Sequence, residues 1–79
     1  MEAAILELLD QRASGSSVCP SEVARALDHA EGGKWRELME PVHRAAVRLA
    51  ETGRVVITQR GVPVDARKVR GPIRISRPV

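Results

Sequence analysis

The stretch of sequence that decides the fold is RVVITQRGVPVDARKVRGPIRIS, residues 54–76. Polarity alternates at its start, so that Val55 and Ile57 would share one face of an extended strand. Ile73 and Ile75 alternate with polar residues in the same way near its end. Two half-buried strands separated by a turn-rich segment indicate a β-hairpin that closes over an apolar core.

The predicted strands are residues 54–58 and 73–76, and the loop 59–72 between them contains two prolines and two glycines. This part of the chain is also its electropositive part. Residues 52–79 hold seven basic side chains and one acidic one, whereas residues 1–51 hold six basic and nine acidic ones. A polyanion would therefore meet the hairpin and its loop first.

Three helical segments precede the hairpin. Apolar residues recur at helical spacing in 2–13, 20–28 and 41–52, and a Gly-rich polar segment separates the last two. Pro41 would interrupt a longer helix, so we expect a short turn at 35–39 before the main helix begins. Each helix has one apolar stripe that needs a partner, so none of them is expected to be stable alone.

The start of the second helix carries the sharpest local signal. Pro20 suits the first helical position, and Glu22 suits the third, from which its carboxylate reaches back to the cap backbone. Cys19 is then the N-cap residue. A helix N-terminus can activate an exposed thiol, which would suit redox sensing. A half-buried cap residue is the more ordinary interpretation, because the chain has no second cysteine to resolve an oxidised one.

Three helices followed by a basic hairpin is the element order of a winged helix. We therefore predict a single α+β domain over residues 1–79, a three-helix bundle with a helix-turn-helix and a C-terminal two-stranded β-hairpin wing. A chain of 79 residues is too short to build a second core. Trp35 is expected to fill the space between the first helix and the hairpin, and Asp65 to cap a turn in the loop.

Distinctive motifs are spread over most of the chain. They are CPSEVA (19–24), Trp35 with Leu38 and Met39, the helical segment 44–50 ending at Gly53, ITQ (57–59) with Gly61, VD (64–65) and GPIR (71–74). Together they resemble a family of small bacterial proteins described as a domain of unknown function. The resemblance implies a winged-helix fold and no established activity, so function has to be argued from the residues.

Duplex DNA binding, as in a transcriptional regulator, is the first hypothesis for function. The outward face of helix 41–52 would read the major groove, with an arginine on guanine and a valine against a thymine methyl group. Cations on the loop 59–72 would contact phosphates or the minor groove. The candidate contacts are His43, Arg44, Val47 and Arg48 on the helix, and Arg60, Arg67, Lys68 and Arg70 on the loop.

A protein-interaction module is the alternative hypothesis, with a partner docked on the outward face of the same helix. Glu37, Glu40 and Glu51 lie on this helical segment and would repel phosphate. Ordinary solvated charges on a basic protein would account for the cations equally well. Neither hypothesis needs a small-molecule substrate.

Catalysis, metal binding and cofactor binding are not expected. His29 and His43 are too few and too far apart for a metal site, and the serines lack a matching histidine and carboxylate. The Gly32-Gly33-Lys34 segment lacks the spacing of a phosphate-binding loop. We therefore expect a binding protein and not an enzyme.

Residue types and segments that the chain lacks argue against several other classes of protein. Without Phe or Tyr it has no stacking platform for single-stranded bases. A lone cysteine cannot form an intrachain disulfide, no apolar run is long enough to cross a bilayer, and no signal sequence is present. These features predict a cytoplasmic protein that has no contact with a membrane.

Overall fold

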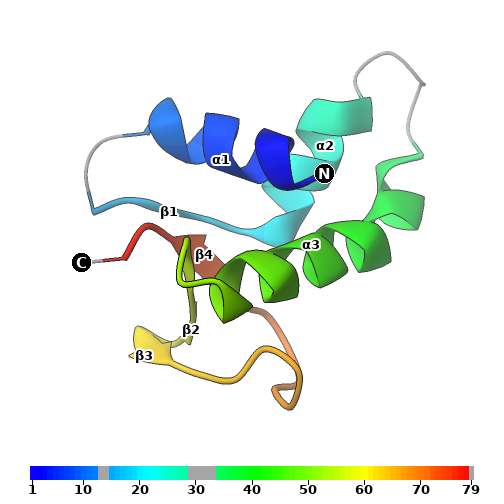
Figure 1. Cartoon of the computed structure of the whole chain (residues 1–79). Helices are drawn as coiled ribbons and strands as arrows, with labels where there is room; N and C mark the ends of the chain where they lie inside the picture. Colours follow the sequence, from blue (N-terminus) through cyan, green and yellow to red (C-terminus); the bar gives the residue numbers. More distant parts are fainter. Residues whose placement is uncertain (13–14, 29–33, 79) are drawn as a thin grey trace.

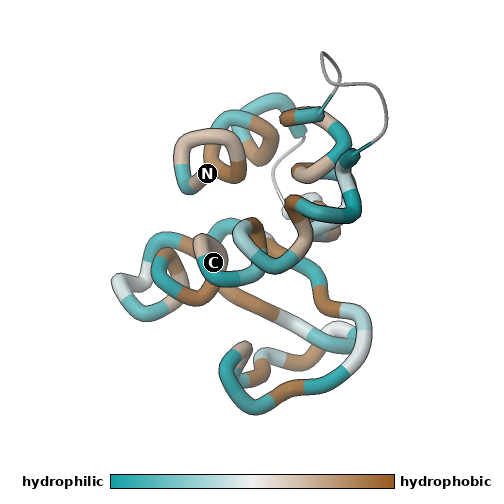
Figure 2. The backbone as a smooth tube through the Cα atoms, turned by 90° about the vertical axis from the view of Figure 1, so that its right-hand side faces the viewer, coloured by the Kyte–Doolittle hydropathy of each residue, from teal (hydrophilic) through white to brown (hydrophobic). Residues whose placement is uncertain are grey.

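Three α-helices and a four-stranded antiparallel sheet make up the computed structural model, which describes residues 1–12, 15–28 and 34–78 (Figure 1). In chain order the elements are α1 (Glu2–Asp10), β1 (Ser17–Val18), α2 (Pro20–Asp28), the 3₁₀ helix η1 (Trp35–Leu38), α3 (Met39–Glu51), β2 (Val56–Gln59), β3 (Val62–Pro63) and β4 (Arg74–Ser76). α1 and α2 lie on one side of α3, and the segment between β3 and β4 passes on the other side. Figure 2, turned by 90°, shows the same order.

The predicted helices are present, with shifted ends. α1 ends at Asp10, earlier than the predicted residue 13, which itself lies outside the described residues. α2 has the predicted bounds, and the turn predicted at 35–39 is η1. The connection from α2 to η1, which includes His29, lies outside the described part of the chain.

The ends of α3 follow from its sequence. Pro41 is its third residue, where a backbone nitrogen has no partner within the helix, so the proline ring costs no hydrogen bond. At the other end, Gly53 has a φ of +77°, a left-handed conformation that favours glycine. Its N–H donates to the Ala50 carbonyl at 3.1 Å. The N–H of Arg54 donates to the Leu49 carbonyl at 2.9 Å, which completes a glycine-terminated helix end.

The sheet extends the predicted hairpin and corrects its strand count. β2 and β4 pair as expected, with Ile57 opposite Ile75. The prediction of a two-stranded hairpin is wrong, however, because the strand order is β1-β4-β2-β3. β1 pairs with β4, with Val18 opposite Ile75, and β3 pairs with β2. β4 is therefore an inner strand that is paired on both sides.

The tight hairpin of this sheet is β2–β3, which lies partly in the segment 59–72 predicted as an irregular loop. Arg60 and Gly61 form its two-residue turn, with φ values of +54° and +80°. Two successive left-handed residues are typical of a type I′ turn, whose twist matches that of the flanking strands. Glycine accepts this conformation easily, but arginine rarely adopts it. The turn therefore holds the Arg60 backbone in an uncommon conformation.

The core lies between the helices and the inner face of the sheet. Its buried apolar side chains are Ile5, Leu9, Val18, Val23, Ala24, Val42, Ala45, Ala46, Leu49, Val55, Ile57, Ala66, Ile73 and Ile75. The four strand residues predicted to face the core are all among them. Ala66 is the unexpected member, because it lies in the segment between β3 and β4.

Trp35 contacts the core, but not where the sequence predicts. Its ring is half-buried, and the guanidinium groups of Arg25 and Arg36 lie 4.5 and 4.6 Å from the ring centroid. Such distances are typical of cation–π contacts. Because Arg25 belongs to α2, Trp35 fastens η1 to α2 and does not fill a gap between α1 and the hairpin.

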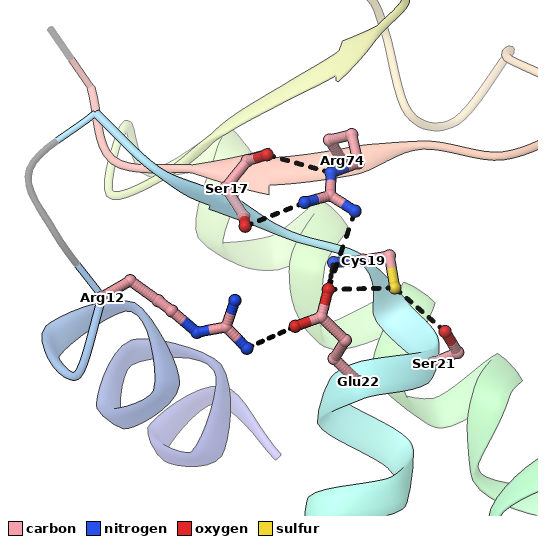
Figure 3. A network of polar contacts seen from close by, with 6 residues as sticks. All are labelled: Arg12, Ser17, Cys19, Ser21, Glu22 and Arg74. Carbon is pink, nitrogen blue, oxygen red and sulfur yellow. Dashed lines mark hydrogen bonds and ion pairs between the residues drawn. The ribbon is translucent and has the colours of Figure 1, made fainter.

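Glu22 links several elements at the start of α2 (Figure 3). Its Oε1 accepts a hydrogen bond from the Cys19 N–H at 3.2 Å, the capping contact predicted from the sequence. Its Oε2 pairs with Arg12, which follows α1. Arg74 of β4 lies 3.6 Å from Oε1 and donates to the Ser17 hydroxyl and carbonyl oxygens at 2.9 and 3.0 Å. One carboxylate thus joins α1 and β4 to α2, and Arg74 extends the network to β1.

These contacts change the titration of Glu22. Burial raises its pKa, but the Cys19 N–H, the Cys19 thiol and the Arg12 guanidinium together lower it by more, so the pKa lies below its ordinary value of 4.5. A folded-state pKa below the unfolded one means that the carboxylate stabilises the fold above pH 4.5. That contribution is lost as the pH falls through the folded-state pKa.

Glu22→Gln keeps an acceptor for the cap but removes the negative charge, so it is expected to lower the free energy of unfolding at neutral pH by about 1 kcal/mol, through the loss of two partly exposed ion pairs and of an acidic side chain near a helix N-terminus. Urea unfolding at neutral pH and again well below pH 4.5 checks this, because the difference from wild type should shrink on acidification. Glu7→Gln, on the exposed face of α1, is the matched control. An undiminished difference in acid would contradict the role of the carboxylate.

Candidate functional site

The exposed side of α3 meets the segment between β3 and β4 in a shallow groove of about 410 Å³, here called the helix groove. It is lined by His43, Arg44, Val47, Arg48, Ala66 and Arg67. The structure thus brings together all four helix residues and one of the loop residues that the sequence predicts as DNA contacts. The 64–69 segment covers part of this face of the helix, so the face is not wholly open.

His43 and Val47 are the two predicted contacts that this segment half covers. The His43 Nε2 lies 3.2 Å from the Ala66 carbonyl oxygen, within hydrogen-bond distance. Val47 packs against the core. Both side chains therefore fasten the segment to α3, and the cations beside them form the outer surface of the helix.

The 64–69 segment is held in a fixed conformation. The Val64 N–H donates to the Ile57 carbonyl at 3.0 Å and continues the pairing of the segment with β2. Asp65 caps a turn as predicted, because its Oδ1 accepts from the Arg67 N–H at 3.0 Å. That hydrogen bond holds the pKa of Asp65 below its ordinary value. The Arg67 guanidinium reaches Glu51 of α3 at 3.3 Å, so the charge of this glutamate is compensated.

Arg44 and Arg48 remain exposed on α3. The Arg48 Nε lies 3.0 Å from the Glu2 carboxylate in an ion pair whose side chains are 54% and 42% exposed. An exposed pair of this kind contributes little to stability and opens easily. Arg44 makes no ion pair within the part of the chain that the structure describes. It is the cation on the helix that is freest to meet a ligand.

A second groove, of about 550 Å³, lies at the N-terminal ends of α2 and α3. It is lined by Cys19, Pro20, Ser21, Met39, Glu40, His43, Gly71, Pro72 and Ile73, and we call it the apolar groove. Of the predicted contacts, only His43 takes part in it. Glu40 is exposed on its wall, so the acidic side chain that argues against phosphate binding here is uncompensated among the described residues.

A third groove, of about 680 Å³, lies between the β2–β3 turn and the strand β4. Its lining is Gln59, Arg60, Arg70, Gly71, Pro72, Ile73 and Arg74, and we call it the arginine groove. It unites the predicted contacts Arg60 and Arg70. Sequence reasoning missed Gln59 and Arg74, and the GPIR motif that contains Arg74 was the only signal pointing to it.

The three grooves adjoin one another, because neighbouring ones share wall residues, and together they are called the joined grooves. His43 lines both the helix groove and the apolar groove, and Gly71, Pro72 and Ile73 line both the apolar groove and the arginine groove. Cations lie at both ends of the resulting surface, with Arg44 and Arg48 at one end and Arg60, Arg70 and Arg74 at the other. Lys68 is exposed but lines none of the three grooves.

Cys19 is half-buried, as expected for a cap residue, with its Sγ 2.9 Å from the Ser21 Oγ and 3.3 Å from the Glu22 Oε1. In residues 1–12, 15–28 and 34–78, no group of three or more His, Cys, Asp and Glu side chains is arranged to hold a metal ion. Nor does this part of the chain contain a helix whose length and apolarity would let it cross a membrane.

Comparison with known proteins places the chain in a family without assigning it an activity. None of the curated proteins matches its sequence. A family described as "Protein of unknown function (DUF3253)" matches residues 1–78, nearly the whole chain. The chain therefore belongs to the DUF3253 family of proteins of unknown function.

Proposed function

We propose that the chain is a winged-helix domain that binds duplex DNA and catalyses no reaction. The observation that carries this proposal is the set of cations that line two of the three adjoining grooves. Arg44, Arg60 and Arg70 line the joined grooves, are exposed, and make no ion pair within the described residues. Cations without partners on a grooved surface suit a polyanion, because binding then breaks no existing ion pair.

The order of elements supports the winged-helix part of the proposal. A helix, a short strand and two further helices are followed by the strands of the sheet, in which β1 pairs with β4 and β4 with β2. In a winged helix, α3 would be the recognition helix, and the segment from β2 to β4 would form the wing. The wing then includes the extra hairpin β2–β3.

The geometry changes the roles that the predicted contacts would have on DNA. Arg44 and Arg48 would face the major groove, where a guanidinium recognises guanine with two hydrogen bonds. Arg60, Lys68 and Arg70 would contact phosphates, which fix the register of the protein but read no sequence. His43, Val47 and Arg67 would act indirectly, by holding the 64–69 segment on α3.

A titration of random-sequence duplex DNA at several salt concentrations tests the proposal. Phosphate contacts by Arg60, Lys68 and Arg70 predict that the logarithm of the binding constant falls against the logarithm of salt with a slope of roughly −2 to −3. Anisotropy of a labelled duplex measures this directly. Absence of binding at low salt, or binding that does not depend on salt, would refute the proposal.

Glu40 supplies a second prediction. Its carboxylate is exposed at the first turn of α3, on the wall of the apolar groove and next to the path proposed for DNA. Glu40→Gln is expected to raise DNA affinity severalfold, by up to roughly eightfold at about 0.1 M salt, the effect of one phosphate contact. The same titration measures it, with Glu37→Gln on η1 for comparison. An affinity unchanged from wild type would argue that α3 does not approach DNA.

Protein binding is a second candidate function, favoured specifically by the apolar groove. A partner could bind the apolar wall of this groove, between the two groups of cations, through contacts with Met39, Pro72 and Ile73. This moves the docking site away from Val47 to the apolar groove, whose wall still includes His43. Met39→Gln, which adds no charge, should then abolish binding of a co-purifying partner and leave DNA affinity within about twofold. Loss of DNA binding with no partner recovered would count against this candidate.

A further inference from the structure

The side chain of Gln59 holds the backbone of the arginine groove in place. Its Nε2 donates to the Arg70 carbonyl oxygen at 2.6 Å and to the Pro72 carbonyl oxygen at 3.3 Å. Gly71 lies between these two carbonyls with a φ of +91°, and a Cβ built there would be 3.4 Å from the Gln59 Nε2. The amide thus fixes residues 70–72 against the end of β2, across a position that favours glycine.

Gln59 also precedes Arg60, so one short segment controls both cations of the groove. The type I′ turn holds Arg60 in a left-handed conformation that glycine or asparagine adopts more readily. A strained residue in a turn is a reason to look for function. Here the strained residue is Arg60, a cation that lines the arginine groove. The same groove is lined by Arg70, whose backbone Gln59 holds in place.

The third wall of the groove is Arg74, whose guanidinium is already anchored. It donates to Ser17 and lies 3.6 Å from the Glu22 carboxylate. Arg60 and Arg70 are exposed, and neither has an ion pair in the described ranges of the chain. The groove therefore contains one anchored and two uncompensated guanidinium groups, and no carboxylate lines it.

We propose that the arginine groove is a binding site for one phosphate of the nucleic-acid backbone. Arg60 and Arg70 bind the phosphate, and Gln59 preorganises the backbone that carries them. This inference rests on the proposed function and adds a defined contact to it. Guanidinium groups match a phosphate with paired hydrogen bonds, and fixing their backbone beforehand lowers the entropic cost of binding. Gln59 is a positioning residue, because its amide is already used by the two carbonyls.

The test compares variants of the full chain in salt titrations with random-sequence duplex DNA. Arg60→Asn removes the charge and suits the left-handed turn, and Arg70→Gln removes the other charge. Because the two arginines share one phosphate, the double variant is expected to reduce the magnitude of the salt slope by about 0.9 and to weaken binding roughly eightfold at about 0.1 M salt, and each single variant should weaken binding by at least about threefold. Arg54→Gln, an exposed cation outside the three grooves, is the matched control and should have less than about a twofold effect.

Gln59→Leu distinguishes positioning from net charge, because it leaves the charge unchanged. It should weaken DNA binding severalfold in the wild-type background. It should have little further effect in the Arg70→Gln background, because Gln59 acts through Arg70. Equal effects in both backgrounds would overturn the positioning role. A far-UV circular dichroism spectrum of each variant checks that the fold is retained.

Failure of this inference differs from failure of the proposed function. If wild type binds DNA but Arg60→Asn and Arg70→Gln behave like Arg54→Gln, the proposed phosphate-binding site is wrong and the proposal of DNA binding stands. If wild type does not bind DNA, the proposed function is wrong. Binding of inorganic phosphate then tests separately whether the arginine groove is a phosphate-binding site. Phosphate should then shift the amide resonances of Arg60, Gly61 and Gly71 beyond the effect of sodium chloride at equal ionic strength. Equal shifts in the two salts would overturn the proposal of a phosphate-binding site.

Discussion

Replacing Arg44, Lys68 and Arg70 together by glutamate is expected to weaken duplex DNA binding by roughly 10²- to 10³-fold at about 0.1 M salt. Lys68 and Arg70 are proposed phosphate contacts, each of which contributes close to one decade of affinity at this salt concentration, and Arg44 adds its charge in the major groove. None of the three makes an ion pair within the described residues, so reversing their charges breaks no contact of the fold. Fluorescence anisotropy of a labelled random-sequence duplex measures the loss.

A second triple variant separates a specific surface from overall charge. Arg25, Arg54 and Arg77 are also exposed, and none of them is a proposed DNA contact. Because Arg25 contacts the Trp35 ring and Arg77 pairs with Asp10, a far-UV circular dichroism spectrum first checks that this variant keeps the fold. Replacing these three by glutamate gives the same net charge as the first variant. It should retain most of the affinity for DNA. Equal losses in the two triple variants would show that only net charge governs binding, and the proposed surface would then be wrong.

Ile75→Ala is expected to lower the free energy of unfolding by about 3 kcal/mol, within the range of 2–5 kcal/mol typical of such core truncations. Ile75 is fully buried in β4, opposite Val18 on one side and Ile57 on the other. A domain of this size has a total stability of only about 4–12 kcal/mol. The thermal midpoint should therefore fall by more than about 10 °C.

Val62→Ala is the matched control for this prediction, because Val62 is also a strand residue but lies on the edge strand β3 with 61% of its surface exposed. It should change the free energy of unfolding by less than about 0.5 kcal/mol. Calorimetry of both variants measures the difference. Comparable destabilisation at the two positions would contradict a sheet with β4 in its interior.

Much of the fold could be predicted from local sequence chemistry. Pro20 and Glu22 marked the start of α2 correctly, because helix caps depend on a few neighbouring residues. Pro41 marked the start of α3 to within two residues, and Gly53 marked its end. The alternation at 54–58 and 73–76 identified the strands that pair as β2 and β4. Each of these signals is contained within a few consecutive residues.

The remaining strands could not be predicted with the same certainty because they are too short to show a pattern. β1 and β3 have two residues each, and alternation cannot be recognised in two residues. Val18 is a single β-branched residue between a loop and a helix, and only its pairing with Ile75 shows that it belongs to a strand. Arg60 carried no signal for a type I′ turn, because asparagine is the usual residue there.

The candidate site was predicted as a set of cations but not as a surface. The segment that covers His43 and Val47 is held by Ala66, a small residue whose burial has no signature in the sequence. Gln59 was missed because its role depends on two carbonyls more than ten residues away. Contacts between distant segments of the chain need the tertiary structure, and most of the site consists of them.

Amide chemical-shift mapping of the chain with a short random-sequence duplex at low salt tests the central claim most directly. The claim predicts that the largest perturbations cluster around Arg44 and Arg48 on α3 and around Arg60 and Arg70 beside the arginine groove. They should reverse when salt is added. Perturbations confined to α1 and α2, or none at any DNA concentration, would contradict it.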